Sequence, residues 1–334
     1  MKELTIRTNE AGQRLDKFLS KYMNRAPKSF LYKMLRKKNI TLNGKKAQGK
    51  EILSAGDTVK LFLSDDTIRN FSEHKEFMSC GTAVGSGMDM RKLDIIYEDA
   101  HTLFINKPVG MLSQKAKPED VSLVEYLTSY LISSGQITRE ELCTFHPAVC
   151  NRLDRNTSGI VAAGKSMAAL QELNAMFRDR RIRKYYLCLV SGTVEQGARL
   201  QGYLEKNEKT NRVSVRSGKG NAISPGAFIE TEYRPLRSGG GTTLLEVHLI
   251  TGKTHQIRAH LASEGHPLIG DYKYGDRKLN DRFRQDYGLR SQMLHSYRLC
   301  FPACTDELAS LSGKELLADA PELFMKICRD RGVM

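Results

Sequence analysis

The sequence lacks the features that mark disulfide-rich, zinc-binding or membrane-spanning proteins. Its 7 cysteines are scattered without a CxxC pair, so we expect reduced thiols and no zinc site. No apolar run approaches the ~20 residues of a membrane-spanning helix, and the first residues lack the apolar core of a signal peptide. We therefore expect a cytoplasmic monomer that uses neither a metal nor another cofactor and has no membrane partner.

Acidic residues are also few relative to basic ones. The 334 residues include 38 Asp and Glu against 52 Lys and Arg, which gives a formal net charge of +14. Such an excess favours a polyanionic partner through counterion release, and nucleic acid is the commonest polyanion. The length is sufficient for about two domains.

Residues 13–63 predict a compact basic unit of two short helices and a small sheet. Apolar residues recur at helical spacing on both sides of Pro27, which can begin the second helix. Asn43-Gly44 follows a predicted strand and is typical of a type I′ turn. The basic side chains of this unit include Arg14, Arg36, Lys37, Lys38, Lys45 and Lys46. They fit an RNA-docking surface, and from this segment alone an ordinary solvated charge face fits them equally well.

The composition divides the chain into three parts. Residues 1–64 form the small α/β unit, residues 65–90 turn to Asp, Ser and Gly and predict a flexible linker, and residues 91–334 are typical of one domain. Hairpin signals in mixed order with helices favour an α+β fold for this last part, with a mixed, largely antiparallel sheet flanked by helices. Helical spacing is found over 121–132 and 166–178, and from Glu307 onward.

The stretch Asn151–Gly159 places one acid, Asp154, between two arginines, Arg152 and Arg155. Turn-forming residues follow, and then an apolar run that predicts a buried strand. The acid should therefore lie in a rigid loop that leads into a core strand, and such loops often carry function. An aspartate that only bonds its own backbone in the turn is the commoner explanation of this pattern.

Two other patterns suggest a phosphate-binding loop and a metal site, and the neighbouring residues argue against both. Residues 159–166 match the P-loop pattern, but their interior is strand material that could not wrap around a phosphate. The histidines at 255, 260, 266 and 295 could indicate a metal site. Positions 255 and 260 do not share a helix face, however, so core or RNA-facing histidines are the better interpretation.

Several motifs in a fixed order resemble those of the RluA-type pseudouridine synthases. The matching stretches are Asn151–Gly159, Asn106–Gly110, Lys184–Tyr186, Thr251–Arg258 and Gly265–Asp271. The N-terminal unit resembles the RNA-binding domain first known from ribosomal protein S-four, through Arg14–Leu19 and Ile40–Gly44. Asn151 stands where the synthase family usually has histidine. The resemblance covers nearly the whole chain.

This resemblance implies an isomerase that converts uridine to pseudouridine in RNA, with ribosomal large-subunit RNA favoured over transfer RNA. It implies that Asp154 is the nucleophile and that Arg258 is its ionic partner. Tyr186 would stack on the uracil flipped out of its helix, with a general-base role left open, and Arg152 would fill the vacated space. The other residues implied to bind substrate are Lys184, His255 and Gln256, together with the basic residues of the N-terminal unit.

The implied chemistry needs only one carboxylate. A glycosidase uses two because it must protonate a poor leaving group and deliver water, whereas uracil can leave as a delocalised anion and return as the nucleophile. Whether the acid attacks the sugar or assists proton removal from it stays open. The alternative function is that of a non-catalytic RNA-binding or ribosome-assembly protein on the same scaffold, which would not need Asp154, Tyr186 and Arg258 together.

Overall fold

The computed structural model describes residues 1–72, 93–139, 141–207, 212–217 and 226–334. Its N-terminal unit is a four-stranded sheet in the order β1-β4-β2-β3, packed against helices. The elements are β1 (Lys2–Thr5), α1 (Leu15–Tyr22), α2 (Lys28–Arg36), β2 (Ile40–Leu42), β3 (Lys45–Lys46), β4 (Thr58–Leu61) and α3 (Asp65–Phe71). The helices α1 and α2 bury the apolar stripes that their spacing predicts, in one cluster with the strands.

The turn between β2 and β3 is of type I′, as the sequence predicts. Asn43 and Gly44 have φ of 51° and 72°, and positive φ at both central positions defines a type I′ turn. The Asn43 side chain also accepts a hydrogen bond from the backbone nitrogen of Thr58 at 2.8 Å, which fixes the turn to β4.

Helix α3 lies in the range where the composition predicts a linker. Ser64 caps its first turn by accepting from the backbone nitrogen of Thr67 at 3.2 Å. Ile68 is buried in the N-terminal cluster, and the ring of Phe71 lies 4.5 Å from that of Phe30. These residues therefore pack with the N-terminal unit. The rest of the predicted linker, residues 73–90, lies outside the described residues.

A second, larger sheet has the order β11-β10-β12-β13-β9-β14-β8-β6-β5, with β7 beside β8 and β15 beside β14. Its strands are β5 (Ile95–Glu98), β6 (Thr102–Lys107), β7 (Ala148–Val149), β8 (Ser158–Gly164), β9 (Arg183–Ser191), β10 (Ala198–Asn207), β11 (Arg212–Ser217), β12 (Ala227–Gly239), β13 (Thr242–Leu249), β14 (Leu294–Cys300) and β15 (Glu315–Leu317). Strands β8 and β14 pair in parallel, and the other neighbours in this order are antiparallel. The mixed, largely antiparallel sheet and the α+β class are thus confirmed.

Strand β8 contains the continuous apolar run 160–163, because both of its faces are covered. Val161 and Ala163 face a cluster that includes α4 (Leu123–Ser133), while Ile160 and Ala162 face α5 (Met167–Arg178). Side chains alternate between faces along a strand, so burial on both sides demands a continuous apolar run. The P-loop-like residues are therefore a core strand, as predicted.

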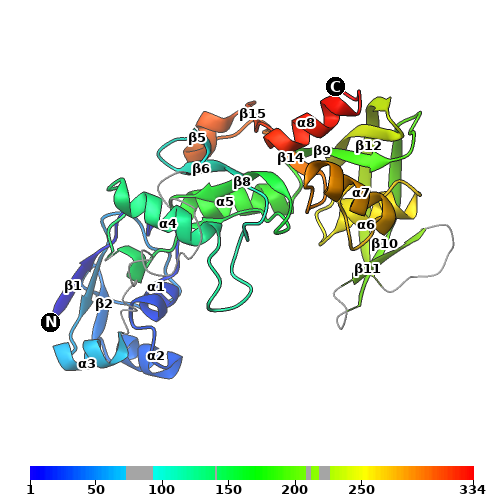
Figure 1. Cartoon of the computed structure of the whole chain (residues 1–334). Coiled ribbons are helices and arrows are strands. Elements are labelled where there is room, and N and C mark those ends of the chain that lie inside the picture. Colours follow the sequence, from blue (N-terminus) through cyan, green and yellow to red (C-terminus); the bar gives the residue numbers. More distant parts are fainter. Residues whose placement is uncertain (73–92, 140, 208–211, 218–225) are drawn as a thin grey trace.

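The other half of the sheet is also covered on two sides. Along β9, Tyr186 belongs to the cluster shared with α4, whereas Leu189 packs against α7 (Arg277–Tyr287) and α8 (Glu322–Asp330). Helix α6 (Gln256–Ser263) packs on the Tyr186 side through Ile257. Figure 1 shows the N-terminal unit at one end of an elongated molecule, α4 and α5 in the middle, and β9–β13 with α6 and α7 at the other end.

The expectation of a helical tail from Glu307 is wrong over its first part. A short 3-10 helix (Asp306–Leu311) ends before Gly313, whose φ of 67° interrupts helical geometry. Strand β15 then pairs with β14, and α8 begins only at Glu322. The tail therefore extends the large sheet before it covers its face.

Candidate active site

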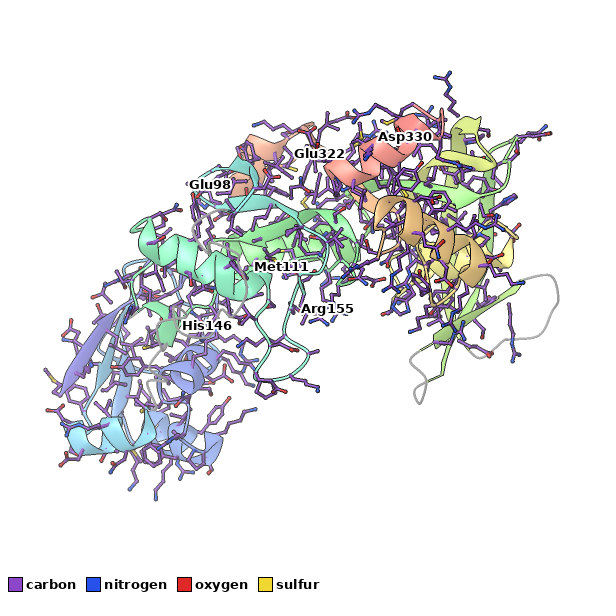
Figure 2. All side chains as sticks on the ribbon, viewed as in Figure 1. Glu98, Met111, His146, Arg155, Glu322 and Asp330 are labelled. Carbon is purple, nitrogen blue, oxygen red and sulfur yellow. The ribbon has the colours of Figure 1, made fainter. Side chains whose placement is uncertain are left out.

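The loop between β7 and β8 holds Asp154 at the junction of the two halves of the large sheet. Ser113 Oγ donates to the carbonyl oxygen of Leu153 and accepts from the nitrogen of the same residue, both at 3.0 Å. The nitrogen of Gly110 donates to the carbonyl oxygen of Arg155 at 2.9 Å. Backbone groups on both sides of Asp154 are thus fixed. Figure 2 places Arg155, its neighbour in the chain, between the α4–α5 part and the α6–α7 part of the molecule.

A fully buried ammonium supports this loop from inside. The Nζ of Lys107 donates to three carbonyl oxygens, those of Met111 at 2.9 Å, Pro108 at 3.0 Å and Arg155 at 3.3 Å. Burial lowers the pKa of Lys107 to about 8, although the carboxylate of Asp154 opposes the shift. The side chain is therefore mainly charged at neutral pH. It places an internal positive charge under the loop that carries the acid.

Asn151 has a clear local role in the structure. Its Nδ2 donates to the carbonyl oxygen of Ile160 at 3.1 Å, and its Oδ1 accepts from the nitrogen of Ala162 at 2.8 Å. The amide side chain therefore continues the backbone pairing of β7 with β8. This contact fixes the start of the loop against the strand that ends it.

An acid–arginine–acid chain lies across the site. Arg258 Nη1 donates to Asp154 Oδ2 at 2.9 Å, while its Nε and Nη2 donate to the two oxygens of Asp271 at 2.7 and 2.9 Å. The Asp271 side chain is 1% exposed and that of Asp154 is 26% exposed. Bidentate pairing with the buried acid fixes the guanidinium plane and aims its remaining nitrogen at the half-buried acid.

The pKa shifts of Asp271 and Arg258 agree with this pairing. Burial raises the pKa of Asp271, but the Arg258 guanidinium and the backbone nitrogens of Lys273 and Tyr274 outweigh burial and lower it overall. Burial lowers the pKa of Arg258, yet the two carboxylates raise it above its ordinary value. Arg258 and Asp271 therefore remain charged at neutral pH, and Asp271 compensates the arginine permanently.

His255 approaches the same carboxylate from the start of α6. Its Nε2 lies 3.8 Å from Asp154 Oδ2, and its Nδ1 lies 2.9 Å from the hydroxyl oxygen of Tyr274. That hydroxyl accepts from the nitrogen of Val213 at 3.0 Å, and burial raises the pKa of Tyr274, so the hydroxyl keeps its proton and can donate it toward Nδ1. The proton of the neutral imidazole then resides on Nε2, facing Asp154.

Tyr186 and Lys184 share one face of β9, since they are two residues apart. Burial raises the pKa of Tyr186 to about 12, and the carboxylate of Asp154 adds to the shift. The phenol is therefore protonated at neutral pH, and its ring can stack while its hydroxyl donates. Burial lowers the pKa of Lys184 to about 8, as does the nearby Arg180. The Lys184 ammonium faces the turn at Gly252.

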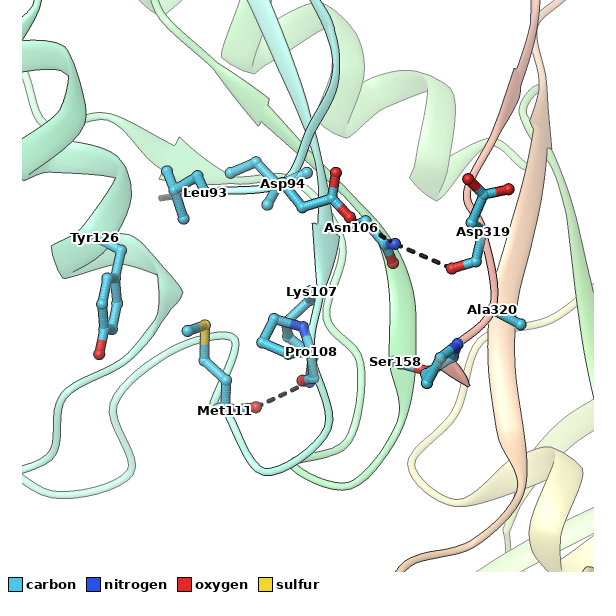
Figure 3. Close-up of a pocket in the computed structure, with 12 residues that line it drawn as sticks. Leu93, Asp94, Asn106, Lys107, Pro108, Met111, Tyr126, Ser158, Asp319 and Ala320 are labelled. Carbon is cyan, nitrogen blue, oxygen red and sulfur yellow. Dashed lines mark hydrogen bonds between the residues drawn. The ribbon is translucent and has the colours of Figure 1, made fainter. Parts of the chain in front are cut away.

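A cavity of about 440 Å³ lies behind the Asp154 loop. Figure 3 shows Lys107, Met111, Ser158 and Asp319 among the residues around it. Neither Asp154 nor Arg258 lines this cavity, so we do not assign it to a reacting substrate. Among the residues that the structure describes, no group of three or more His, Cys, Asp or Glu side chains is placed to hold a metal.

Both the N-terminal unit and the larger domain of this chain are similar to known proteins. A family model described as RNA pseudouridylate synthase matches residues 101–263, and one described as S4 domain matches residues 13–59. The ribosomal large subunit pseudouridine synthase C of Escherichia coli K12 is 31% identical over 309 residues, which cover 90% of this chain and 88% of the relative. The chain belongs to the RNA pseudouridylate synthase family. The protein of the same name from Vibrio vulnificus is 31% identical over 293 residues, 87% of this chain and 85% of the relative.

Solved structures share the fold of the synthase. Human RNA pseudouridylate synthase domain containing 4 aligns with a TM-score of 0.57 at 20% identity, over 70% of this chain and 91% of its own. Human RNA pseudouridylate synthase domain containing 1 aligns with a TM-score of 0.51 at 23% identity, over 73% of this chain and 98% of its own. The matching family models and the curated relatives confirm the enzyme class and the RNA partner inferred from the motifs. No helix among the described residues of the synthase is long and apolar enough to span a membrane.

The structure separates the predicted site residues of the synthase into two groups. Asp154, Arg258 and His255 converge, and the Asp154 carboxylate helps to raise the pKa of Tyr186. Arg152, two residues before Asp154 in the chain, is exposed. Gln256 is buried and bonds the backbone and side chains around Thr251 and Glu230. The second group belongs to the N-terminal unit and is exposed: Arg14, Arg36, Lys37, Lys38, Lys45 and Lys46. Arg14 pairs there with Asp16 at 2.9 Å.

The sequence alone did not indicate a role in the site for Asp271, Tyr274 or Lys107. Asp271 follows the apolar residues Leu268 and Ile269, and an acid at the end of a buried run is a weak signal for a buried ion pair. Its pairing with Arg258 depends on a chain reversal that spacing does not reveal. Lys107 lies in the motif stretch Asn106–Gly110, but nothing in that stretch indicates the three carbonyl contacts of its ammonium.

Gly159→Ala should destabilise the synthase by about 2–4 kcal/mol, through backbone strain and overpacking. Gly159 has φ of 113°, and a Cβ there would lie 2.6 Å from the backbone nitrogen of Ser296 on the parallel strand β14. Urea unfolding of both proteins measures the difference. Gly44→Ala is the control for positive φ alone, since no atom lies within 4 Å of its added Cβ. Equal losses in the two variants would contradict the close approach of β8 and β14.

Asp271→Asn should lower the free energy of unfolding by about 1.5–3 kcal/mol at neutral pH, because a charged hydrogen-bond acceptor is lost. The folded-state pKa of Asp271 is depressed, so its contribution is complete above the unfolded pKa of about 3.9 and is lost as the pH falls through the lower folded pKa. The gap between wild type and variant should therefore narrow below about pH 4. A gap that widens in acid would contradict this assignment.

Proposed function

We propose that this synthase isomerises a specific uridine to pseudouridine in ribosomal large-subunit RNA, with Asp154 as the catalytic carboxylate. The proposal rests on the 2.9 Å contact between Asp154 and Arg258. Arg258 holds a cation against this carboxylate, and that cation is itself compensated by Asp271. The named relatives act on ribosomal large-subunit RNA, and the net charge of +14 suits such a substrate.

The reaction proceeds from a uridine that has left its helix, at a cost of a few kcal/mol. Asp154 acts on the ribose, either by covalent attack or by assisting proton removal, while uracil leaves as a delocalised anion. Tyr186 stacks on the detached ring and holds it while it turns. The protonated phenol favours hydrogen-bond donation over general-base action, because its pKa is raised to about 12. A bond from uracil C5 to the sugar C1′ then forms while the bond to Asp154 breaks, or, in the proton-removal route, while the sugar regains its proton. The base finally loses its C5 proton and gains one at N1.

The other predicted residues serve binding. Arg152, exposed beside the acid, fills the space that the flipped nucleotide leaves. Lys184 and His255 contact the nucleotide, and Gln256 supports the turn that carries His255. The basic surface of the N-terminal unit contacts phosphates of the RNA around the target.

We also propose the boundaries and state of the protein. The N-terminal RNA-binding domain extends from residue 1 to Ser72, because α3 packs on its core. A linker joins it to a catalytic domain from residue 91 to the end. The synthase acts as a cytoplasmic monomer.

The test uses purified synthase and two unmodified substrates, a transcript of large-subunit RNA and a pool of transfer RNA transcripts. Pseudouridine mapping after incubation should find one or a few new sites in the large-subunit transcript. Modification of the transfer RNA pool alone would overturn the substrate. Tight binding without pseudouridine in either RNA would favour the alternative of a non-catalytic ribosome-assembly factor.

A further inference from the structure

We propose that a polar clamp docks the N-terminal domain rigidly on the catalytic domain, so that its RNA-binding surface lies at a fixed position relative to Asp154. The clamp joins residues 7–12 of the first domain to residues 138–139, 141–144 and 167–171 of the second. The consequences of the clamp for RNA recognition rest on the proposed function. The structural part of the inference stands on the contacts alone.

Glu141 is the centre of the clamp. Its Oε1 lies 2.9 Å from Arg7 Nη1 and accepts from Asn9 Nδ2 at 3.2 Å, while its Oε2 accepts from the backbone nitrogen of Thr138 at 2.6 Å. Burial raises the pKa of Glu141, but the Thr138 nitrogen and Arg7 lower it overall. One carboxylate thus orders its own segment and engages two side chains of the other domain.

Glu10 forms a contact in the opposite direction, from the N-terminal domain to the catalytic domain. Glu10 is only 6% exposed, accepts from the backbone nitrogen of Arg7 at 2.9 Å and accepts from the hydroxyl of Thr144. Cys143, beside Thr144, packs against the N-terminal apolar cluster. Figure 2 shows His146 of the same segment lying against the N-terminal domain. The described residues between 138 and 146 therefore bond and pack on a domain other than their own.

Helix α5 supplies a third point of attachment. The backbone nitrogen of Met167, in the first turn, donates to the carbonyl oxygen of Asn9 at 3.1 Å, and Gln171 Nε2 donates to the carbonyl oxygen of Gly12 at 3.2 Å. The first backbone nitrogens of a helix have no partner within the helix. The N-terminal domain satisfies one of them here. Attachment at three separate points prevents rotation about any single contact.

A fixed orientation has a consequence for substrate choice. A flexibly tethered RNA-binding domain raises the local RNA concentration for many arrangements of target and anchor. A docked domain favours RNAs whose bound element lies at one distance and angle from the target uridine. Large structured RNA offers such an arrangement, and an isolated stem-loop that fills only the catalytic site does not.

Arg7→Glu is the variant that tests the clamp. It places a second carboxylate against Glu141, and the arginine side chain is 54% exposed, so folding should tolerate the change. Arg69→Glu is the matched control, because Arg69 is 78% exposed on α3 and lies outside the clamp. Both variants change the net charge equally, so general electrostatic effects on RNA binding cancel in the comparison.

Two quantities are measured on the wild type and on both variants. Hydrogen exchange should be at least tenfold faster at the Met167 amide in Arg7→Glu than in wild type or Arg69→Glu. The KM for a long large-subunit RNA fragment should rise at least tenfold in Arg7→Glu with kcat unchanged, while the KM for an isolated stem-loop that carries the target stays the same. This split indicates lost binding remote from the chemistry.

The outcomes separate the two proposals. Unchanged Met167 exchange in Arg7→Glu, or equal KM changes for the long RNA and the stem-loop, would overturn the clamp. If the wild-type protein forms no pseudouridine in either RNA, the proposed function fails, and exchange at Met167 alone decides whether the domains are docked.

Discussion

Asp154→Asn protein is expected to form pseudouridine at least about 10³-fold more slowly than wild type, because loss of an essential nucleophile typically costs this much or more. Asparagine has the same shape and can still accept the hydrogen bond that Arg258 donates at 2.9 Å. The fold should therefore be retained. RNA binding should be no weaker, since the change removes a negative charge from a protein that binds a polyanion. Single-turnover assays with saturating enzyme measure the rate without interference from binding.

Asp286→Asn is the matched control for this experiment. Asp286 is exposed on α7, and the substitution makes the same change of charge outside the site. Its single-turnover rate should equal that of wild type. A rate for Asp154→Asn within a few-fold of the control would show that another group performs the chemistry.

Arg258→Met should destabilise the protein by about 3–5 kcal/mol and also remove its activity. Asp271 is 1% exposed, and both of its oxygens are paired with the guanidinium. Removal of one partner of a buried ion pair leaves an uncompensated buried charge, which accounts for the size of the effect. Asp154 would lose its cationic partner in the same step. Urea unfolding and single-turnover assays measure the two effects separately.

The double variant Arg258→Met with Asp271→Leu separates stability from catalysis. Replacement of both buried charges by apolar side chains should recover much of the lost stability. The activity should stay absent, since Asp154 still lacks the guanidinium. If the double variant regained both stability and activity, the arginine would serve only to neutralise Asp271, and its proposed role beside the nucleophile would be wrong.

Local signals in the sequence were sufficient for much of the fold. The continuous apolar run of β8 predicted a buried strand, and Asn43-Gly44 predicted its turn because few other residues accept positive φ. The tail was predicted less well. Its apolar spacing indicated one helix, but Gly313 interrupts that helix and the pairing of β15 with β14 is a long-range interaction.

The site was predictable only where the family resemblance supplied the residue. Asp154 and Arg258 are 104 positions apart, and their contact depends on how α6 packs against the Asp154 loop. No spacing rule gives that contact. The Asp271 pair and the three carbonyl contacts of Lys107 likewise exist only after the chain has closed. The role of Asn151 could not be predicted from the sequence either, because its partners are backbone groups of Ile160 and Ala162 on a neighbouring strand.

The most direct test of the account is pseudouridine mapping of ribosomal RNA from cells that lack the synthase, complemented with wild-type or Asp154→Asn protein. We predict that at least one uridine of the large-subunit RNA is unmodified in the deletion strain. Wild-type protein should restore pseudouridine there, and the Asp154→Asn protein should not, at equal expression. A deletion strain with an unchanged pseudouridine map, or full restoration by Asp154→Asn, would contradict the account.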